Sequence, residues 1–360
     1  MSLEDTALRN DIKYLFFFFL FLISCSKKHK EYADNVFAYS EFPQEKELKG
    51  EVIELDTALL RYPFRIRIEE DKAIVMDLHG LDHYGHLFQY PSFQYLSSFG
   101  KRGDSPTEML SMENFRLQDR GVWTLDANKG ELTRLDFSSS GDSLLRDETV
   151  TLDEDILRPL DFAIYNDTTF VIPDYSGESR FLKVDCKGKL IEKIGTIPTT
   201  NKKALQEARP ALAQAWRSFL DYNSHNSVLA TVTQLGEVVE IYNLKDSTHV
   251  IRVGEYDEPE FKVSDGYGIP TGIMGFSDVQ VTDDAIYAVF HGTSFKDIAR
   301  QSGRLPDGGK YIYVFSLKGE PLCKYVLDHY IYGIWVDEVT KTIMATDVNN
   351  DQPILKFSFG

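Results

Sequence analysis

The stretch that decides the fold is Phe99-Gly-Lys-Arg-Gly-Asp-Ser-Pro-Thr-Glu108, which joins two segments rich in alternating apolar residues. Its Gly, Pro and Asp residues are typical of a turn. On both sides, short alternating runs end in turn residues, a pattern that predicts half-buried β-strands. The same all-β unit returns about every fifty residues, a spacing expected of propeller blades. We therefore expect residues 99–108 to connect one blade to the next.

Six such repeats are recognisable, each with an inner strand, a second strand and an outer hairpin. The expected inner strands begin near residues 64, 115, 162, 228, 279 and 331. Four of the second strands end in an aspartate, namely Asp77, Asp126, Asp174 and Asp347. A carboxylate in this position accepts backbone N–H bonds and fixes the turn that follows, and we prefer this role to a catalytic one.

The sixth repeat ends at Gly360 with three strands, whereas residues 50–56 hold one strand to spare. We expect that N-terminal strand to complete the last blade, because closing the ring removes the sheet edges that invite aggregation. The predicted fold class is thus an all-β, six-bladed β-propeller over residues 50–360, closed by an N-terminal strand.

Read as Phe-Gly-x-x-Gly-x-x-Pro-x-Glu, residues 99–108 resemble the blade connector of NHL-type and TolB-like six-bladed propellers. The connectors at Ile194-Gly195 and Val253-Gly254 depart from it and keep only the apolar–glycine pair. With this connector, the six repeats and the Leu22-Ile-Ser-Cys25 sequence near the N-terminus, the chain resembles the TolB-like propeller lipoproteins of Bacteroidetes. The resemblance implies a binding or scaffolding role in the cell envelope.

The N-terminus predicts an export signal and a lipid anchor. Residues 14–23 form an apolar run that is too short to span a bilayer as a helix but suits a signal peptide. Leu22-Ile-Ser-Cys25 follows at once and looks like a bacterial lipobox, which implies acylation of Cys25 and removal of residues 1–24. The acidic residues before the apolar run disagree with such a signal, and a buried strand is the alternative. Ser26 after the cysteine implies the outer membrane.

Residues 25–49 lack apolar periodicity and predict a flexible tether. The partners expected of the whole protein are therefore the membrane, through the lipid on Cys25, and an envelope protein, peptide or glycan. A net charge of −17 repels phosphate backbones and disfavours nucleic-acid binding. We expect a monomer, with Cys186 and Cys323 as free thiols because they fall in different repeats.

Two long insertions interrupt the repeats. Residues 202–222 have a helical pattern that Pro210 should kink or split, between the third and fourth blades. Residues 293–309 form a polar, Gly-containing loop inside the fifth blade. In a propeller, the connections between blades and those between second and third strands share one face, here called the long-loop face. We expect function to lie there, because long ordered loops are uncommon without a use.

Three sets of residues on that face are candidate sites. The first is a loop with three histidines and an aspartate, His79, Asp82, His83 and His86, whose residue types suit Zn²⁺ or another transition metal. The second is a ring at the expected inner-strand starts, Asn114, Asp161, Asn226 and Asp278, whose oxygens suit Ca²⁺, as in propeller lactonases. A polar exposed loop and a hydrated channel mouth are the simpler interpretations of these two sets.

The third set is aromatic and basic and suits recognition of a peptide, a glycan or an acidic ligand. Its members are Tyr175, Arg180, Trp216, Tyr267, His291, Lys296, Arg300, Tyr332 and Trp335, of which we expect Trp335 to be a core residue. The chain has no nucleophile elbow, phosphate-binding loop, dinucleotide fingerprint or His-Glu-x-x-His motif, which lowers the case for an enzyme. The first hypothesis is a lipid-anchored binding module, and the alternative is a Ca²⁺- or Zn²⁺-dependent hydrolase or lactonase.

Overall fold

The computed structural model describes residues 33–55, 60–166, 169–300 and 306–360. Contacts divide the chain into Met1–Asp34 and Asn35–Gly360, and of the first unit only residues 33 and 34 are described. The predicted signal peptide, Cys25 and the first part of the tether therefore lie outside the described residues. In the part of the chain that is described, no helix has the length and hydrophobicity needed to cross a membrane.

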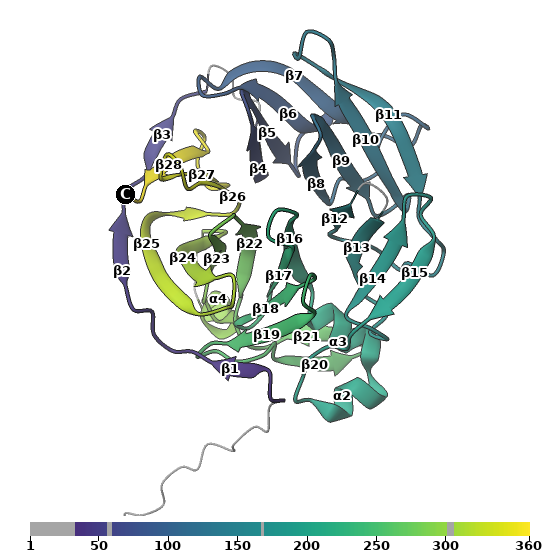
Figure 1. Cartoon of the computed structure of the whole chain (residues 1–360), viewed down its shortest axis with the longest axis vertical. Coiled ribbons are helices and arrows are strands. Elements are labelled where there is room, and N and C mark those ends of the chain that lie inside the picture. The colour runs from purple at the N-terminus through teal and green to yellow at the C-terminus, as the bar shows by residue number, and fades with distance from the viewer. Residues whose placement is uncertain (1–32, 56–59, 167–168, 301–305) are drawn as a thin grey trace, which may run out of the picture. The chain divides into compact units, whose positions relative to one another are not determined.

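Residues 35–360 form six antiparallel blades around a central channel (Figure 1). Blades I to III contain β4 (Pro63–Glu69), β5 (Lys72–Asp77), β6 (His83–Gln89) and β7 (Gln94–Lys101); β8 (Asn114–Gln118), β9 (Gly121–Asp126), β10 (Glu131–Phe137) and β11 (Leu144–Thr151); and β12 (Ala163–Asn166), β13 (Thr169–Pro173), β14 (Phe181–Asp185) and β15 (Leu190–Ile194). Each blade begins at the channel and ends at the outside, so the predicted six-bladed fold is confirmed.

Blades IV to VI contain β16 (Ser218–Asn223), β17 (Val228–Thr233), β18 (Val238–Asn243) and β19 (Thr248–Val253); β22 (Phe276–Val281), β23 (Ala285–Phe290), β24 (Gly309–Ser316) and β25 (Pro321–Ile331); and β26 (Ile334–Asp337), β27 (Thr342–Thr346), β28 (Ile354–Ser358) and β3 (Glu51–Ile53). The N-terminal strand β3 pairs with β28 in antiparallel register, with Ile53 opposite Ile354. The predicted closure of the ring by an N-terminal strand is thus confirmed.

The segment before β3 corrects one prediction. β1 (Val36–Ala38) pairs in parallel with β19, and β2 (Glu45–Leu48) pairs in parallel with β25. Blades IV and V therefore have five strands, and residues 36–48 are not a flexible tether. These strands lack the apolar alternation of a half-buried strand because they lie on the outer edge, where backbone hydrogen bonds hold them.

The helical insertion lies between blades III and IV, as predicted, but it is shorter than expected. α2 (Lys202–Glu207) and α3 (Arg209–Ala215) are separated at Ala208, and Pro210 occupies the first turn of α3. The chain then enters β16, the inner strand of blade IV. The strand that we expected to be innermost, β17, is therefore the second strand, and Asn226 lies in the turn between the two.

The aspartates at the ends of second strands fix turns, as predicted. Asp126 accepts hydrogen bonds from the backbone N–H groups of Leu110 and Lys129 at 2.7 and 3.0 Å. Asp77 accepts from Tyr62 N–H at 2.7 Å, and Asp174 accepts from Ser179 N–H at 2.8 Å. Each carboxylate thus ties its turn to a neighbouring segment of the long-loop face.

The connector at residues 99–108 is held by several contacts. Lys101 Nζ lies 2.7 Å from a Glu108 carboxylate oxygen, and Lys129 donates to the Ser105 carbonyl at 2.8 Å. Gly103 has a φ of +153°, and a Cβ there would lie 2.0 Å from the Glu108 carboxylate. The Gly and the Glu of the connector pattern therefore depend on each other, because only glycine leaves room for the carboxylate that holds the turn.

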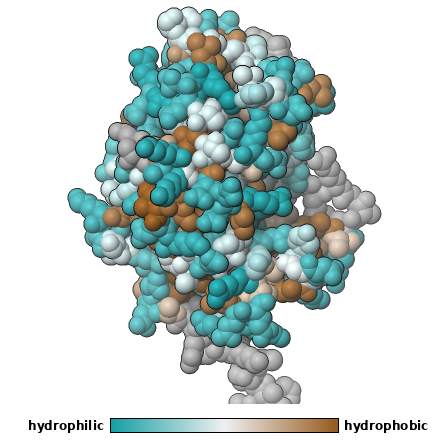
Figure 2. All heavy atoms as spheres, turned by 90° about the vertical axis from the view of Figure 1, so that its right-hand side faces the viewer, coloured by the Kyte–Doolittle hydropathy of each residue, from teal (hydrophilic) through white to brown (hydrophobic). Residues whose placement is uncertain are grey.

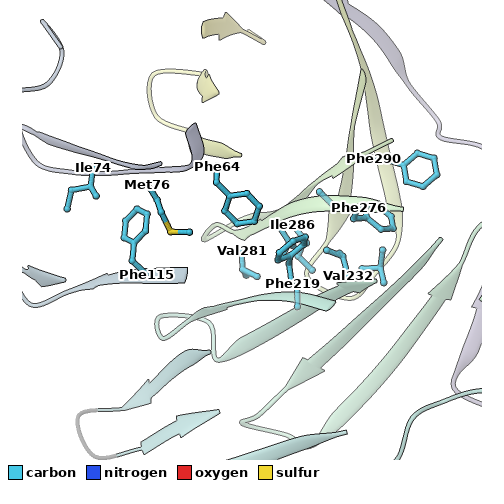
Figure 3. Packing of buried hydrophobic residues seen from close by; sticks show 14 of the residues in the cluster. Phe64, Ile74, Met76, Phe115, Phe219, Val232, Phe276, Val281, Ile286 and Phe290 are labelled. Atoms are coloured by element: carbon cyan, nitrogen blue, oxygen red, sulfur yellow. The ribbon is translucent and has the colours of Figure 1, made fainter. Parts of the chain in front are cut away.

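Apolar side chains fill the spaces between neighbouring blades. In the largest cluster, Met76 and Phe115 come from blades I and II, whereas Phe219 and Phe276 come from blades IV and V (Figure 3). The outer surface of the side shown in Figure 2 is mostly hydrophilic, with hydrophobic residues in small groups. Cys186 and Cys323 are free thiols, as predicted.

Candidate functional site at the short-turn mouth of the channel

The long insertions do pack together near blades III to V. The hairpin of β20 (Phe261–Ser264) and β21 (Tyr267–Pro270) contacts α3, where the Gln214 side chain accepts a hydrogen bond from Gly268 N–H at 2.9 Å. The loop that carries α4 (Phe295–Arg300) bonds to the same connection, from Phe295 N–H to the Gly272 carbonyl at 3.0 Å. The insertions are thus an ordered cluster on the long-loop face.

The aromatic and basic residues predicted to form one binding surface do not share one environment. Trp216 and Arg180 are buried, and the Arg180 guanidinium lies 2.7 Å from the Glu240 carboxylate. Tyr175 is half-buried, and burial raises the pKa of its phenol. Arg180 and Trp216 therefore stabilise the contact between blades III and IV rather than face a ligand.

The remaining members of that set are dispersed. Lys296 and Arg300 are exposed on α4, where Arg300 lies 3.9 Å from Asp297. Tyr267 is exposed at the tip of the β20–β21 hairpin. His291 is buried at the end of β23, and its Nδ1 accepts from Thr293 N–H at 3.2 Å.

The histidine loop does not form a metal site. His79 is exposed and packs against the Tyr62 ring at 4.6 Å, whereas His86 is buried in β6 and its Nδ1 lies 2.9 Å from the Ser98 hydroxyl. Burial lowers the pKa of His86. His83 lies between them at the start of β6. Within the described ranges, no group of three His, Cys, Asp or Glu residues is placed to hold a metal ion.

The upper half of the channel, toward the long-loop face, is filled by aromatic rings around an arginine. Phe64 of blade I and Phe219 of blade IV come from opposite sides of the ring, yet their centroids are 5.9 Å apart. The Arg65 guanidinium lies 4.3 Å from the centroid of each ring. Tyr332 of the connection to blade VI packs on Phe64 at 4.7 Å. The channel is therefore closed at this level.

Below these aromatic rings, arginines connect blades that are not neighbours. Arg67 of blade I lies 3.2 Å from Asp278 of blade V and donates to the Ile334 carbonyl of blade VI at 2.7 Å. Arg116 of blade II lies 2.6 Å from Asp161 of blade III and donates to the Leu220 carbonyl of blade IV at 2.7 Å. Each arginine thus ties three blades together.

The carboxylates of this network also bond to the next blade. Asp161, Asp221 and Asp278 accept from the backbone N–H groups of Leu220, Val281 and Ile334 at 3.0, 2.8 and 2.9 Å. Asn114 donates to Asp161 at 2.7 Å. Asn114, Asp161 and Asp278 are therefore used by blade-to-blade contacts. Asn226 lies away from them and bonds to the Thr282 carbonyl at 2.8 Å.

A cavity of about 500 Å³ opens on the opposite, short-turn face, where all six inner strands end. Arg67, Arg116 and Asp221 lie in its lining, and Tyr165, Tyr222 and Trp335 supply aromatic rings. The Tyr165 and Tyr222 rings are 5.6 Å apart. Burial raises the pKa of Asp221, although Arg67 and Arg116 oppose this shift. A concave site with a few polar groups and aromatic walls is typical of ligand binding.

Comparisons with known proteins agree with the six-bladed fold. The sequence profile described as "TolB-like 6-blade propeller-like" matches residues 41–339. The chain belongs to the TolB-like six-bladed propeller family. No curated protein matches this chain in sequence.

Solved structures show the same fold at low identity. A putative exported protein from Bacteroides fragilis is 12% identical, with a TM-score of 0.56 over 89% of this chain and 98% of its own. A member of the DUF4221 family from Bacteroides vulgatus is 10% identical, with a TM-score of 0.54 over 88% and 96%. An auxiliary nutrient binding protein from Bacteroides ovatus is 10% identical, with a TM-score of 0.52 over 83% and 70%.

The TolB-like propeller has a second hollow of about 520 Å³ on the same short-turn face. It shares Tyr222, Gln280 and Trp335 with the channel cavity and reaches the turns of blades IV to VI. Gln280 spans the gap between blades V and VI, because its amide bonds both the N–H and the carbonyl of Val336, at 2.8 and 3.2 Å. The two hollows together offer space for a ligand longer than one small ring.

The sequence interpretation missed most residues of this TolB-like cavity. Arg65 and Arg67 alternate with Phe64, Ile66 and Ile68 in one inner strand. Two charged side chains in such a buried strand were the sequence feature that could have indicated polar groups in the channel. Tyr222 and Asp221 were missed because the helical pattern was extended over β16. Trp335, expected in the core, is half-buried and lies between the core and the cavity.

Proposed function

We propose that this TolB-like propeller is a lipid-anchored binding protein in the envelope of a Gram-negative bacterium, with its ligand at the short-turn mouth of the channel. The observation that carries the proposal is the cavity lined by Arg67, Arg116 and Asp221 and walled by aromatic rings. The opposite half of the channel is filled by Phe64 and Phe219, so a ligand in the channel enters from the short-turn face.

The envelope location rests on the lipobox at Cys25 and the apolar run before it. It agrees with two proteins of like fold from Bacteroides, one described as a putative exported protein and the other as an auxiliary nutrient binding protein. A nutrient-binding role would account for both the lipid anchor and the cavity.

The charge balance of the channel favours an uncharged polar ligand. The guanidinium groups of Arg65, Arg67 and Arg116 face the carboxylates of Asp278 and Asp161, and Asp221 lies close to Arg67 and Arg116. The cavity lining itself has two arginines, Arg67 and Arg116, and two aspartates, Asp119 and Asp221, which leaves little net field for an ion. A sugar offers hydroxyl groups to such polar side chains and apolar ring faces to aromatic walls. We therefore propose a short oligosaccharide as the ligand class.

Binding is favoured over the metal-dependent hydrolase alternative for a structural reason. A Ca²⁺ ion needs six to eight oxygen ligands, roughly. Asp161 and Asp278 instead accept hydrogen bonds from arginines and from the backbone of the next blade. A melting curve with and without Ca²⁺ or Zn²⁺ tests this choice, because a metal that binds only the folded protein would raise the melting temperature, and the rise would grow with the logarithm of the metal concentration above its Kd.

The experiment that tests the binding site is titration of a neutral oligosaccharide library into the full chain, followed by calorimetry on the best binder. Tyr222→Ala should weaken binding by about 1–3 kcal/mol, because a buried aromatic contact to the ligand is lost. Tyr267→Ala is the matched control, since Tyr267 is 60% exposed on the long-loop face.

Hydrogen exchange in the presence of the binder then separates the two faces. Protection at residues 164–166 and 221–224 supports the channel mouth. If Tyr267→Ala weakens binding and Tyr222→Ala does not, the ligand lies on the long-loop face near Lys296 and Arg300, as the sequence alone predicted. Protection confined to the long-loop face would contradict the proposed site in the same way.

A further inference from the structure

A third cavity, separate from the two hollows of the short-turn face, lies under the residues that follow β1 and include the first residue of β2. We call residues 39–45 the strap. The cavity under it measures about 480 Å³ and lies between the strap and blades IV and V. It shares no lining residue with the channel cavity. Any ligand of this cavity is therefore independent of the function proposed above.

Aromatic rings form the walls of the strap cavity. Phe42 of the strap packs on Tyr313 of β24 at 4.7 Å, and Tyr313 stacks on Phe290 of β23 at 4.8 Å. Tyr256, which follows β19, lies 6.2 Å from Phe290 and is 47% exposed. Tyr311 also lines the cavity. The rings come from the strap, the segment after β19, and strands β23 and β24, so the strap supplies one wall of the cavity.

A buried carboxylate lies in the same lining. Glu237 is 3% exposed, and one of its oxygens accepts a hydrogen bond from Tyr256 N–H at 3.1 Å. A Cβ on Gly254 would lie 2.0 Å from the Glu237 carboxyl carbon, so a larger residue there would displace the carboxylate. Burial raises the pKa of Glu237, and no lysine or arginine acts on it in the opposite direction. The carboxylate is thus buried without a cationic partner among the described residues.

The hydroxyl of Tyr39 lies beside this carboxylate. Tyr39 is 8% exposed and lines the cavity. Burial raises the pKa of its phenol, and the charge of Glu237 together with a hydrogen bond to that carboxylate raises it further. The hydroxyl and the carboxylate thus form a buried polar pair in an aromatic cavity with no cation among the described residues, and a buried negative charge without an opposite charge points to a cationic ligand.

The cavity's own lysine does not neutralise Glu237. Lys324 lies 2.9 Å from the Glu45 carboxylate and 4.8 Å from the centroid of the Tyr311 ring. Glu41 and Glu255 also line the cavity. The lining thus has four glutamates and one lysine that already has a partner, with His291 as the remaining ionisable base. Burial lowers the pKa of His291, which keeps its ring neutral.

We propose that the strap cavity binds a small organic ammonium ion. A carboxylate supplies the opposite charge, and aromatic faces attract a cation through their quadrupoles. An inorganic cation is disfavoured, because Ca²⁺ or Mg²⁺ requires about six or more oxygen ligands rather than aromatic walls. The Tyr39 hydroxyl oxygen accepts a hydrogen bond from a primary or secondary ammonium group.

The test is calorimetric titration of the full chain with choline, n-butylammonium and the neutral isostere 3,3-dimethylbutan-1-ol. Both cations should bind, and the neutral alcohol should bind at least about ten-fold more weakly, because one charge-assisted contact is missing. Equal binding of choline and the alcohol would show an apolar cavity only and would overturn the proposal. Absence of binding by both cations at millimolar concentration would overturn it as well.

Variants then assign the binding to the cavity. Glu237→Gln should reduce cation affinity about ten-fold or more, whereas Glu192→Gln, an exposed site on β15, changes the net charge equally and should leave affinity unchanged. Because a variant at the buried Glu237 can fail to fold, the exposed Tyr256 provides a second pair of variants. Tyr256→Leu should weaken choline several-fold, and Tyr256→Phe should retain it. Unchanged choline affinity in both folded variants, Glu237→Gln and Tyr256→Leu, would place the cation elsewhere.

Discussion

The guanidinium of Arg67 on β4 lies 3.2 Å from the carboxylate of Asp278 on β22, and the two strands belong to blades I and V, with blade VI between them. Asp278 has 1% of its surface exposed and also faces Arg65 at 3.3 Å. Burial raises the pKa of Asp278, but the two arginines and the Ile334 N–H lower it more, so the carboxylate stays ionised. One aspartate therefore holds the two buried arginines of blade I.

Asp278→Asn should destabilise the propeller strongly. The substitution keeps the shape of the side chain but removes the carboxylate that pairs with the buried Arg65 and Arg67, and breaking such a buried pair typically costs about 3–5 kcal/mol. Urea unfolding monitored by circular dichroism measures the change. Glu178→Gln is the control, because the pair of Glu178 and Lys193 is exposed and should contribute nothing measurable. A loss below about 1 kcal/mol in Asp278→Asn would show that the network is not needed for stability.

Glu240 predicts a pH dependence with a definite sign. Burial alone would raise its pKa, but Arg180 and His249 lower it to about 2 in the folded protein. The unfolded value is near 4.3. Because the folded value is depressed, this carboxylate stabilises the fold above the unfolded pKa, and the contribution is lost as pH falls from about 4.3 toward 2.

The measurement is the free energy of unfolding from pH 6 to pH 2.5 for the wild type and for Glu240→Gln. The variant should be less stable near pH 6 by several kcal/mol, roughly, because Arg180 remains buried without its partner. The difference should shrink as the pH falls below about 4. Parallel curves at all pH values would mean that Glu240 does not titrate in this window.

The sequence predicted the elements that repeat and missed those that do not. Asp77, Asp126 and Asp174 each follow an apolar strand, so their turn-fixing role is visible locally. The strand β2, Glu45–Leu48, carries three charged residues out of four and is held by backbone bonds to β25. No local pattern distinguishes such an edge strand from a tether, because its partner lies nearly three hundred residues away.

The candidate site was harder to predict for a related reason. Trp216 and Arg180 have residue types suited to binding, but Arg180 is drawn into the interface of blades III and IV by Glu240 on β18. Residue type alone cannot show whether a buried partner exists elsewhere in the chain. Because the predicted helix covered β16, the predicted strands of blade IV were shifted by one. The prediction therefore placed Asn226 among the polar residues at the inner-strand starts and left Asp221 out.

Cys25→Ala tests the lipid anchor. The cysteine follows directly after the apolar run, so its replacement should abolish lipid labelling and block removal of residues 1–24. Labelled palmitate and mass spectrometry of the membrane fraction measure both effects. Cys186→Ala is the matched control, because that thiol lies in the propeller and should not alter labelling. Incorporation of palmitate by Cys25→Ala would contradict the anchor.

Shortening the N-terminus should reveal two separate contributions to the ring. A chain that begins at Gly50 keeps β3 but loses β1, β2 and the strap. Tyr39 packs on Phe315 at 5.3 Å and Phe42 packs on it at 5.5 Å, so both buried contacts disappear. Removing two aromatic side chains from such a cluster should cost about 3–6 kcal/mol, at about 1.5–3 kcal/mol for each. The outer edges of β19 and β25 also become free to pair with other chains.

A chain that begins at Tyr62 additionally loses β3 and leaves β28 as an open edge, so it should be the least stable and the most prone to aggregate. Thermal melting and size-exclusion chromatography should rank the chain from Asn35 first, the chain from Gly50 second and the chain from Tyr62 third. The chain from Gly50 should also lose choline binding while its channel cavity, built from the inner strands alone, is retained. Equal melting temperatures for the chains from Asn35 and Gly50 would show that β1, β2 and the strap contribute nothing to stability. Choline affinity that survives removal of residues 35–49 would show that Tyr39 and Phe42 do not form part of the cation site.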